Sequence, residues 1–328
     1  MITVTLNPSI DRTLWVHGFR AGATFLADRS EDYAGGKGVN TSRALLRMGA
    51  ASTATGILGA RGGRLYRDIL EREGISHRFL ACEGRVRTNV TVLSGRGVPE
   101  THIRDRGPAL PAETTGQFLR LLDTILAGPA AQTAKPRGEP GPGAPVHPSA
   151  VVVLSGSLPE GFQSATYARI IERIRANGAL AYFDASGEPL RLGLESKPAF
   201  IKPNRHEVRE ALGFLPRSER DCLRAVAAFH AMKIPLVMVS RGTEGLVLSD
   251  GKEAVSAKTP VEEPVNSVGS GDAAVAGAVL GFLEHLSLEE TARLACAMGG
   301  ANTLLPGGGA LEKEQVLRLS RMTRVKRL

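Results

Sequence analysis

Short apolar runs rich in β-branched residues alternate along the chain with longer segments whose apolar residues recur every three to four positions. The runs predict strands and the longer segments predict amphipathic helices. The expected strands are Ile2–Leu6, Ser52–Ile57, Ala150–Leu154, Leu180–Phe183 and Leu236–Val239. The expected helices are Val39–Arg47, Arg64–Glu73, Glu113–Leu126, Tyr167–Ala176, His206–Leu212 and Cys222–Met232. This alternation predicts an α/β fold, with a mostly parallel central sheet between two layers of helices.

Three strand-like segments, Arg12–Val16, Arg87–Ser94 and Glu100–Arg104, have no helix between them. We expect them to form a small antiparallel β-sheet that covers one edge of the main sheet as a lid. The predicted core is then residues 1–10, 34–84 and 109–328, and the predicted lid is residues 11–33 and 85–108. Within the core, residues 128–148 are rich in Pro, Gly and Ala, which predicts a mobile surface insertion. The segment Ala273–Leu305 is expected to form two consecutive helices.

The composition is that of a globular protein, with 328 residues of which 42% are hydrophobic. The net charge is +8, but five positive charges and no acidic residue lie in the last eleven positions. We interpret this segment as a solvated basic tail. One Trp and four Tyr provide no basic-aromatic stripe on which bases could stack, so a nucleic-acid partner is not expected.

The three cysteines, Cys82, Cys222 and Cys296, are widely spaced and form no CxxC pair, which argues against a disulfide framework or a zinc ribbon. The first residues lack the basic start and apolar run of a secretory signal. No apolar stretch is long enough to span a bilayer. We therefore expect a cytoplasmic protein without a membrane partner.

The most informative motif is Gly269-Ser270-Gly271-Asp272, which leads directly into an Ala- and Val-rich helix. Glycines before a helix allow backbone N–H groups to converge on an anion, and the helix N-terminus favours negative charge there. A carboxylate in the same turn can accept a proton from a hydroxyl that attacks a bound phosphoryl group. Taken alone, Asp272 would be an ordinary acidic residue in the first turn of a helix.

Two further motifs also precede helices. The run from Gly35 to Asn40 (GGKGVN) is neither a P-loop nor a dinucleotide fingerprint, but a glycine turn with a lysine can hold hydroxyls and an anionic group. An ordinary turn with a helix cap is an equally good interpretation. In Lys202–Glu207 (KPNRHE), Asn204 and Glu207 lie three apart and could hold hydrated Mg²⁺. The same pair is almost a capping box, and the two roles are compatible.

Weaker signals come from turns that follow other predicted strands. Each is more often an ordinary turn, but a parallel sheet would gather them, and the motifs above, at its carboxyl edge. These segments are Asp11, Ser155–Pro159, Asp184–Glu188 and Ser240–Gly245.

Together, these motifs resemble the PfkB (ribokinase-like) family of sugar kinases, in particular its branch of 1-phosphofructokinases, minor 6-phosphofructokinases and tagatose-6-phosphate kinases. The resemblance runs in order over nearly the whole chain. The matching segments are TLNPSID (5–11), AGGKGVNTSRAL (34–45), VVLSGSLPEG (152–161), DASGE (184–188), KPNRHE (202–207), VSRGTEG (239–245) and SVGSGDAAVAG (267–277).

The resemblance implies a three-layer ribokinase-like fold and ATP-dependent phosphorylation of a phosphorylated ketohexose, with fructose 1-phosphate ahead of fructose 6-phosphate and tagatose 6-phosphate. It implies that Asp272 is the catalytic base and that Gly269, Ser270 and Gly271 form the anion hole. Mg²⁺ would be organised through water by Asn204 and Glu207, and a homodimer would form through the lid. Sugar phosphate would be bound by Asp11, Gly35, Gly36, Lys37, Asn40, Arg87, Arg104 and Ser155. ATP would be bound by Lys202, Asn204, Ser240, Gly242, Gly245, Val268, Cys296 and Gly299.

Two other functions remain open at this point. A kinase of an unphosphorylated sugar or nucleoside would make poor use of the three cations Lys37, Arg87 and Arg104. A catalytically silent protein that binds sugar phosphate or nucleotide would have no need of a proton acceptor such as Asp272.

Overall fold

The computed structural model describes residues 1–95, 98, 100–128 and 150–328. Most of the predicted insertion at 128–148 therefore lies outside the described residues.

The main sheet has ten strands in the order β14-β13-β12-β11-β10-β9-β8-β1-β4-β5. From β11 to β5 all neighbours pair in parallel, and β12, β13 and β14 extend the sheet by antiparallel pairs. The strands span Ile2–Thr5 (β1), Thr53–Gly59 (β4), Ser76–Arg85 (β5), Val151–Ser155 (β8), Leu180–Asp184 (β9), Phe200–Ile201 (β10), Leu236–Ser240 (β11), Leu246–Ser249 (β12), Ala254–Lys258 (β13) and Arg324–Arg327 (β14).

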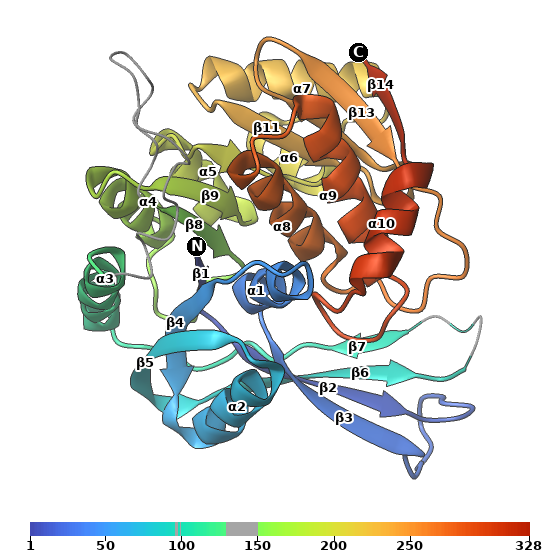
Figure 1. Cartoon of the computed structure of the whole chain (residues 1–328). Helices are drawn as coiled ribbons and strands as arrows, with labels where there is room; N and C mark the ends of the chain where they lie inside the picture. Colours follow the sequence, from blue (N-terminus) through green and yellow to red (C-terminus); the bar gives the residue numbers. More distant parts are fainter. Residues whose placement is uncertain (96–97, 99, 129–149) are drawn as a thin grey trace.

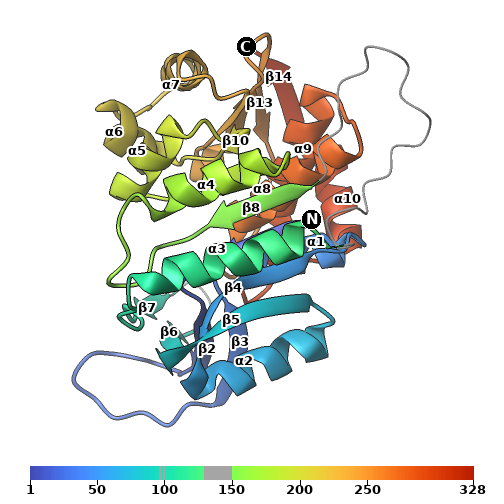
Figure 2. The ribbon, with the colours of Figure 1, turned by 90° about the vertical axis from the view of Figure 1, so that its left-hand side faces the viewer.

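Helices cover both faces of this sheet, so the fold has three layers, as the sequence predicted (Figures 1 and 2). One layer contains Lys37–Arg47 (α1), Ala60–Glu73 (α2), Ser270–Leu283 (α8), Leu288–Asn302 (α9) and Lys313–Met322 (α10). The other contains Glu113–Leu126 (α3), Thr166–Ala176 (α4), Gly187–Glu195 (α5), Arg205–Leu212 (α6) and Glu219–Ala231 (α7).

The central strands are apolar on both sides because each side packs against helices. In β8, Val152 and Leu154 belong to the hydrophobic cluster beneath α3 to α7, whereas Val151 and Val153 belong to the cluster beneath α8 to α10. Burial on both faces explains why this strand reads as a continuous apolar run in the sequence.

A second, four-stranded sheet has the order β3-β2-β6-β7 and lies beside the main sheet in Figure 1. Its strands span Ser9–Trp15 (β2), Arg29–Gly35 (β3), Arg87–Leu93 (β6) and Thr101–Ile103 (β7). The chain passes from β1 into β2 through Leu6, Asn7 and Pro8, and it returns from β3 directly into α1. The small sheet is therefore joined to the core next to the GGKG turn. The expectation that this sheet is antiparallel was wrong for its central pair, because β2 and β6 run parallel, whereas β3 and β7 pair with them in antiparallel fashion.

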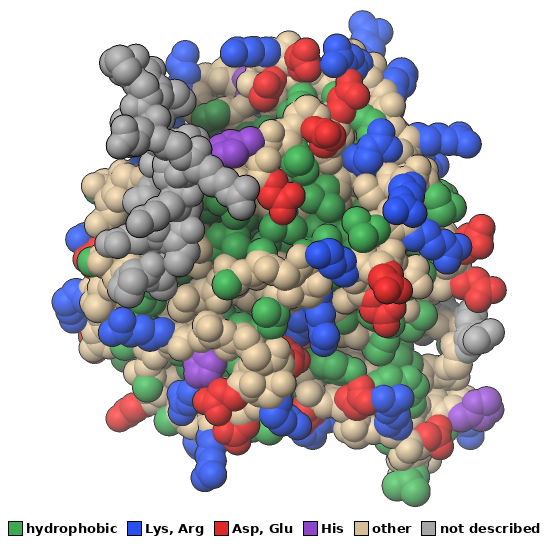
Figure 3. Space-filling model, viewed as in Figure 1, with side chains coloured by type: hydrophobic (Ala, Val, Ile, Leu, Met, Phe, Trp, Pro, Cys, Tyr) green, Lys and Arg blue, Asp and Glu red, His purple; other side chains and the backbone are tan. Residues whose placement is uncertain are grey.

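The interpretation of the C-terminal segment as a solvated tail was wrong. Residues 313–322 form α10, and Arg324–Arg327 forms the last strand of the main sheet, paired with β13. The basic side chains remain largely exposed along this edge strand. On the face shown in Figure 3, Lys and Arg side chains in general are interspersed with acidic side chains. Across the described part of the chain, none of the helices combines the length and apolar character needed to cross a membrane.

Candidate active site

The turn before α8 is shaped by glycine. Gly269 caps the helix with a φ of 84°, a left-handed conformation that favours glycine. A Cβ on Gly269 would also lie 2.5 Å from the Cα of Gly308, in the loop after α9. The first N–H groups of a helix have no partner within it, so the backbone N–H of Gly271 is available to a negatively charged group, and that of Ser270 makes only a long bond of 3.4 Å to the carbonyl of Ser267.

Asp272 lies in the first turn of α8 and is only 5% exposed. Its Oδ2 accepts a hydrogen bond from the side-chain Nδ2 of Asn40, at 2.8 Å. Burial raises the pKa of Asp272 to about 6, against the opposing effect of nearby Lys37. The group is therefore a carboxylate at neutral pH, with a pKa high enough to take up a proton readily.

Two lysines flank the buried carboxylate of Asp184, which ends β9. Lys37 Nζ donates to Asp184 Oδ2 at 3.2 Å, and Lys202 Nζ lies 3.4 Å from Oδ1. Burial alone would raise the pKa of Asp184, but the two lysines outweigh it and hold the pKa below its usual range. Conversely, Asp184 raises the pKa of Lys37. Lys37 is therefore held as a cation, and Lys202 contacts the other oxygen of the same carboxylate.

These groups surround one cavity of about 520 Å³ between the main sheet and the small sheet. Many of the residues predicted from sequence line it, although they come from distant parts of the chain. They are Asp11, Gly36, Lys37, Asn40, Arg87, Arg104, Ser155, Lys202, Asn204, Ser240, Val268, Gly269, Ser270, Gly271 and Asp272.

At the small-sheet end of the cavity, Asp11 is held by neighbours on both sides. Its Oδ1 accepts hydrogen bonds from Ser9 Oγ at 2.7 Å and from Asn89 Nδ2 at 2.8 Å. Gly35 does not line the cavity. A Cβ at that position would overlap the Asp11 carboxylate, so Gly35 provides the room that Asp11 occupies.

The two predicted phosphate-binding arginines differ in how they are held. The Arg87 guanidinium donates to the backbone oxygens of Asn7 (2.9 Å) and Asp105 (3.2 Å), so it also ties the small sheet to the end of β1. Arg104 is exposed, and its guanidinium contacts His102 Nδ1 at 3.5 Å. Arg104 is therefore the more available cation.

At the start of α6, Asn204 and Glu207 form the capping box that the spacing allowed. Asn204 Oδ1 accepts from the backbone of His206 and Glu207, and Glu207 Oε2 accepts from the backbone of Asn204 at 2.7 Å. Asn204 lines the cavity, and Glu207 lies buried behind it. Burial, together with the charge of Asp184, raises the pKa of Glu207.

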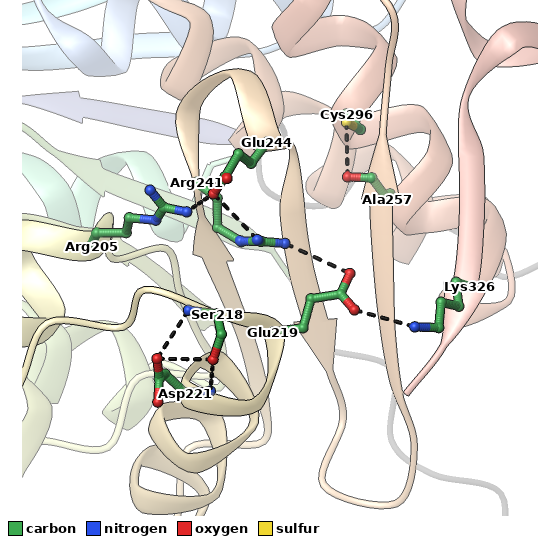
Figure 4. A network of polar contacts seen from close by, with 9 residues as sticks. All are labelled: Arg205, Ser218, Glu219, Asp221, Arg241, Glu244, Ala257, Cys296 and Lys326. Atoms are coloured by element: carbon green, nitrogen blue, oxygen red, sulfur yellow. Dashed lines mark hydrogen bonds and ion pairs between the residues drawn. The ribbon is translucent and has the colours of Figure 1, made fainter.

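Four of the predicted ATP-binding residues, Gly242, Gly245, Cys296 and Gly299, do not line this cavity. Gly242 and Gly245 belong to the turn between β11 and β12, where Arg241 contacts Glu244 (3.3 Å) and Glu219 (3.7 Å) (Figure 4). The thiol of Cys296 donates a hydrogen bond to the carbonyl oxygen of Ala257. Gly299 faces the backbone of Ser270: a Cβ on Gly299 would lie 3.1 Å from the carbonyl oxygen of Ser270.

The sequence prediction missed several polar residues of the cavity. Most follow a strand of the main sheet directly or lie opposite Asp11 in the small sheet, so a register for the sheets would have identified them. Ser155 Oγ is buried and has no hydrogen-bond partner in the described part of the chain, which suits a site that receives a polar ligand. The missed residues are Thr5, Asn7, Ser9 and Asn89, whereas Gly156, Ser157, Asp184 and Ser186 lie in two of the turns expected at this edge but were given no individual role.

Comparison with known proteins places the chain in a family. The family model described as pfkB family carbohydrate kinase matches residues 5–125 and 111–314. A 1-phosphofructokinase of Bacillus subtilis (strain 168) is 32% identical, with 96% of each chain covered. A tagatose-6-phosphate kinase of Staphylococcus epidermidis is 29% identical over 93% of this chain and 92% of its own.

Solved structures agree with the sequence comparison. The crystal structure of a putative phosphofructokinase from Staphylococcus aureus matches with a TM-score of 0.79 and 28% identity, covering 100% of this chain and 99% of its own. The site has a buried carboxylate at a glycine-rich helix start, with two lysines beside it. These features and the similarity over the full length of the chain lead to one assignment. The chain belongs to the pfkB family of carbohydrate kinases.

Proposed function

We propose that this carbohydrate kinase transfers the γ-phosphoryl group of ATP to a hydroxyl of a phosphorylated ketohexose, with fructose 1-phosphate as the preferred substrate. The observation that carries the proposal is the buried carboxylate of Asp272, with its pKa of about 6, in a cavity that also contains Lys37, Arg87 and Arg104. The full-length relatives named as 1-phosphofructokinase and tagatose-6-phosphate kinase support the same class of substrate.

In this mechanism, Asp272 accepts the proton of the attacking hydroxyl as the new oxygen–phosphorus bond forms. The bond between the γ-phosphorus and the bridging oxygen breaks, and ADP leaves with the electron pair of that bond. The backbone N–H groups at Gly269–Gly271 stabilise the negative charge on the transferring group. Lys202 supports them, because its Nζ lies 3.2 Å from where a Cβ on Gly271 would be.

Replacement of Asp272 tests the role of the base. Asp272→Asn is expected to lower kcat by about 10²- to 10⁴-fold, because the amide cannot accept the proton. In the wild type, kcat/KM should fall as the pH drops below about 6, since protonation removes the active carboxylate. Steady-state kinetics from pH 5 to 8 measure both effects. Asp68→Asn, on the exposed face of α2, is the control, and normal turnover by Asp272→Asn would exclude the assignment.

Mg²⁺ is the metal that ATP chemistry implies, and the residues present fit it. Glu207 is a buried carboxylate that forms no ion pair with any described residue, and the negative charge of Asp184 lies near it. The described residues contain no cluster of three or more His, Cys, Asp or Glu that would enclose a metal. This agrees with an ion held through water by Asn204 and Glu207. When bound, Mg²⁺ would neutralise charge on the phosphates of ATP.

Glu207→Gln separates the metal role from the capping role, because glutamine can still accept the backbone N–H of Asn204. We expect the Mg²⁺ concentration for half-maximal activity to rise about 10-fold or more while the melting temperature changes little. The measurement is a Mg²⁺ titration at fixed ATP, with Glu210→Gln one turn further along α6 as the matched control. An unchanged requirement for Mg²⁺ would contradict this role.

Arg104 is proposed to bind the phosphate already present on the sugar, because its guanidinium is largely unused by the protein. Arg104→Ala should raise the KM for the sugar phosphate about 10-fold or more, as expected for the loss of a charge-assisted hydrogen bond. The KM for ATP should stay the same. Arg106→Ala, two residues further on and outside the cavity, is the control. Equal effects of the two variants, or a rise in the KM for ATP alone, would count against the proposal.

A homodimer through the small sheet is also proposed. Leu26, in the loop between β2 and β3, is 93% exposed, and Ile103, on the edge strand β7, is 58% exposed. Exposed edge strands with apolar side chains are prone to pair with another chain. Analytical ultracentrifugation should find a dimer that Ile103→Lys dissociates, whereas Leu317→Lys on α10 leaves it intact. A monomeric wild type would exclude this arrangement.

A further inference from the structure

Arg43 lies in α1 outside the cavity and is buried, with a side chain only 5% exposed. Its Nε and Nη2 contact Glu73 Oε2 at 2.9 and 2.8 Å. Nη2 also donates to the backbone oxygen of Ala34 at 2.7 Å. Nη1 donates to the backbone oxygen of Gly308 at 2.6 Å and to Asn40 Oδ1 at 3.2 Å. A guanidinium has five N–H groups, and these contacts use all of them.

The contact between Arg43 and Asn40 determines which way the Asn40 amide faces. A guanidinium only donates hydrogen bonds, so it must face the carbonyl oxygen of Asn40. The NH₂ group of Asn40 is then left on the opposite side, 2.8 Å from Asp272 Oδ2, where it donates to the carboxylate. The reverse orientation would place two acceptors, an amide oxygen and a carboxylate oxygen, against each other.

Arg43 also contacts the loop that supports the anion hole. A Cβ on Gly308 would lie 2.5 Å from Asn40 Nδ2, and Gly308 itself packs against Gly269. The bond from Arg43 to the Gly308 carbonyl therefore fixes the loop that touches both Asn40 and the turn before Asp272. Through Ala34, the same guanidinium holds the start of the GGKG turn.

We propose that Arg43 is a positioning residue of this kinase. It fixes the Asn40 amide with its NH₂ group toward Asp272, and so holds the carboxylate in place for proton transfer. The proposal rests on the role of Asp272 proposed above. Arg43 touches none of the reacting groups and acts through Asn40.

Asp272 and Arg43 each have other charged or titratable groups around them, and a substitution at position 43 must be judged against these neighbours. Asp272 is influenced by Lys37 from α1, by Asp184 at the end of β9 and by Lys202 after β10. Around Arg43 lie Glu73 and Tyr66 from α2 and Tyr33 from β3. Lysine at position 43 retains the positive charge but has only three N–H groups and no planar fork, so it cannot make all five contacts.

The test is a double-mutant cycle of Arg43→Lys and Asn40→Ala, measured by kcat and by the pH dependence of kcat/KM. Arg43→Lys should lower kcat about 10- to 100-fold, the cost expected when a catalytic group is misplaced. It should also move the acidic limb of the pH profile upward by about one unit, and leave the KM for ATP unchanged. In the Asn40→Ala background, Arg43→Lys should cost little more, because the residue through which it acts is absent.

Two controls separate positioning from stability. Arg47→Lys makes the same change one turn along α1, on the exposed surface, and should have no effect on kinetics. Glu73→Gln weakens the ion pair but can still accept from Arg43, so it should lower the melting temperature and leave the pH profile in place. If Arg43→Lys lowers only the melting temperature, or if its effect on kcat adds fully to that of Asn40→Ala, Arg43 is merely structural and the proposal is wrong.

Asn40→Asp provides a second test should Arg43→Lys fail to fold. The aspartate keeps an oxygen for Arg43 but places another oxygen against Asp272, so the acidic limb should rise by more than a unit. An unshifted limb would overturn the proposal. Asp272→Asn distinguishes failure of the proposed base from failure of the proposed positioning residue. If this variant stays active, the assignments of Asp272 as the base and of Arg43 as its positioning residue are both wrong. If it is inactive while the cycle is additive, only the positioning is wrong.

Discussion

A carboxyl group kept out of water at the N-terminus of α8 is the feature on which the rest of the site depends. Burial of Asp272 favours its neutral form, and a fully neutralised group could not accept a proton. Lys37 and Lys202 oppose this effect, and Asn40 donates a hydrogen bond that the carboxylate can accept. The balance leaves a pKa of about 6, at which the group is ionised at neutral pH and is still a useful base.

The residues that surround Asp272 and determine its pKa come from distant segments of the chain. The parallel strands β1, β8, β9, β10 and β11 end at the same edge of the main sheet, so the residues that end or follow them meet in one cavity. α8 brings Asp272 to that edge, and the close approach of Gly269 to Gly308 keeps its turn narrow. The small sheet adds Asp11, Asn89 and Arg104 from the opposite side. Neither sheet alone would enclose the site.

Much of this arrangement can be predicted from the sequence, because it follows from local rules. The alternation of apolar runs and helical segments indicates the three layers, and Gly269–Asp272 indicates an anion site at a helix start. Pairings between distant residues cannot be found in this way. Asn40 and Asp272 are 232 positions apart, and Asp184 reads as an ordinary turn residue until β9 is placed beside β8 and β10.

The role of Arg43 also cannot be predicted from the sequence. An arginine in an amphipathic helix would normally be exposed, and only the tertiary contacts with Glu73, Ala34 and Gly308 reveal it as buried and fully bonded. The basic C-terminal segment was misinterpreted because its charges suggest solvent. Edge strands tolerate such charges, and β14 carries them on its exposed side.

The most direct measurement is the release of ADP by purified protein with ATP and Mg²⁺ over a panel of acceptors. The panel comprises fructose 1-phosphate, fructose 6-phosphate, tagatose 6-phosphate, fructose, ribose and adenosine. Turnover confined to ketohexose phosphates, and fastest with fructose 1-phosphate, is the predicted result. Turnover with fructose, ribose or adenosine but with none of the three phosphates would contradict the proposed roles of Lys37, Arg87 and Arg104. No turnover with any acceptor, while ATP still binds, would contradict the proposed activity itself.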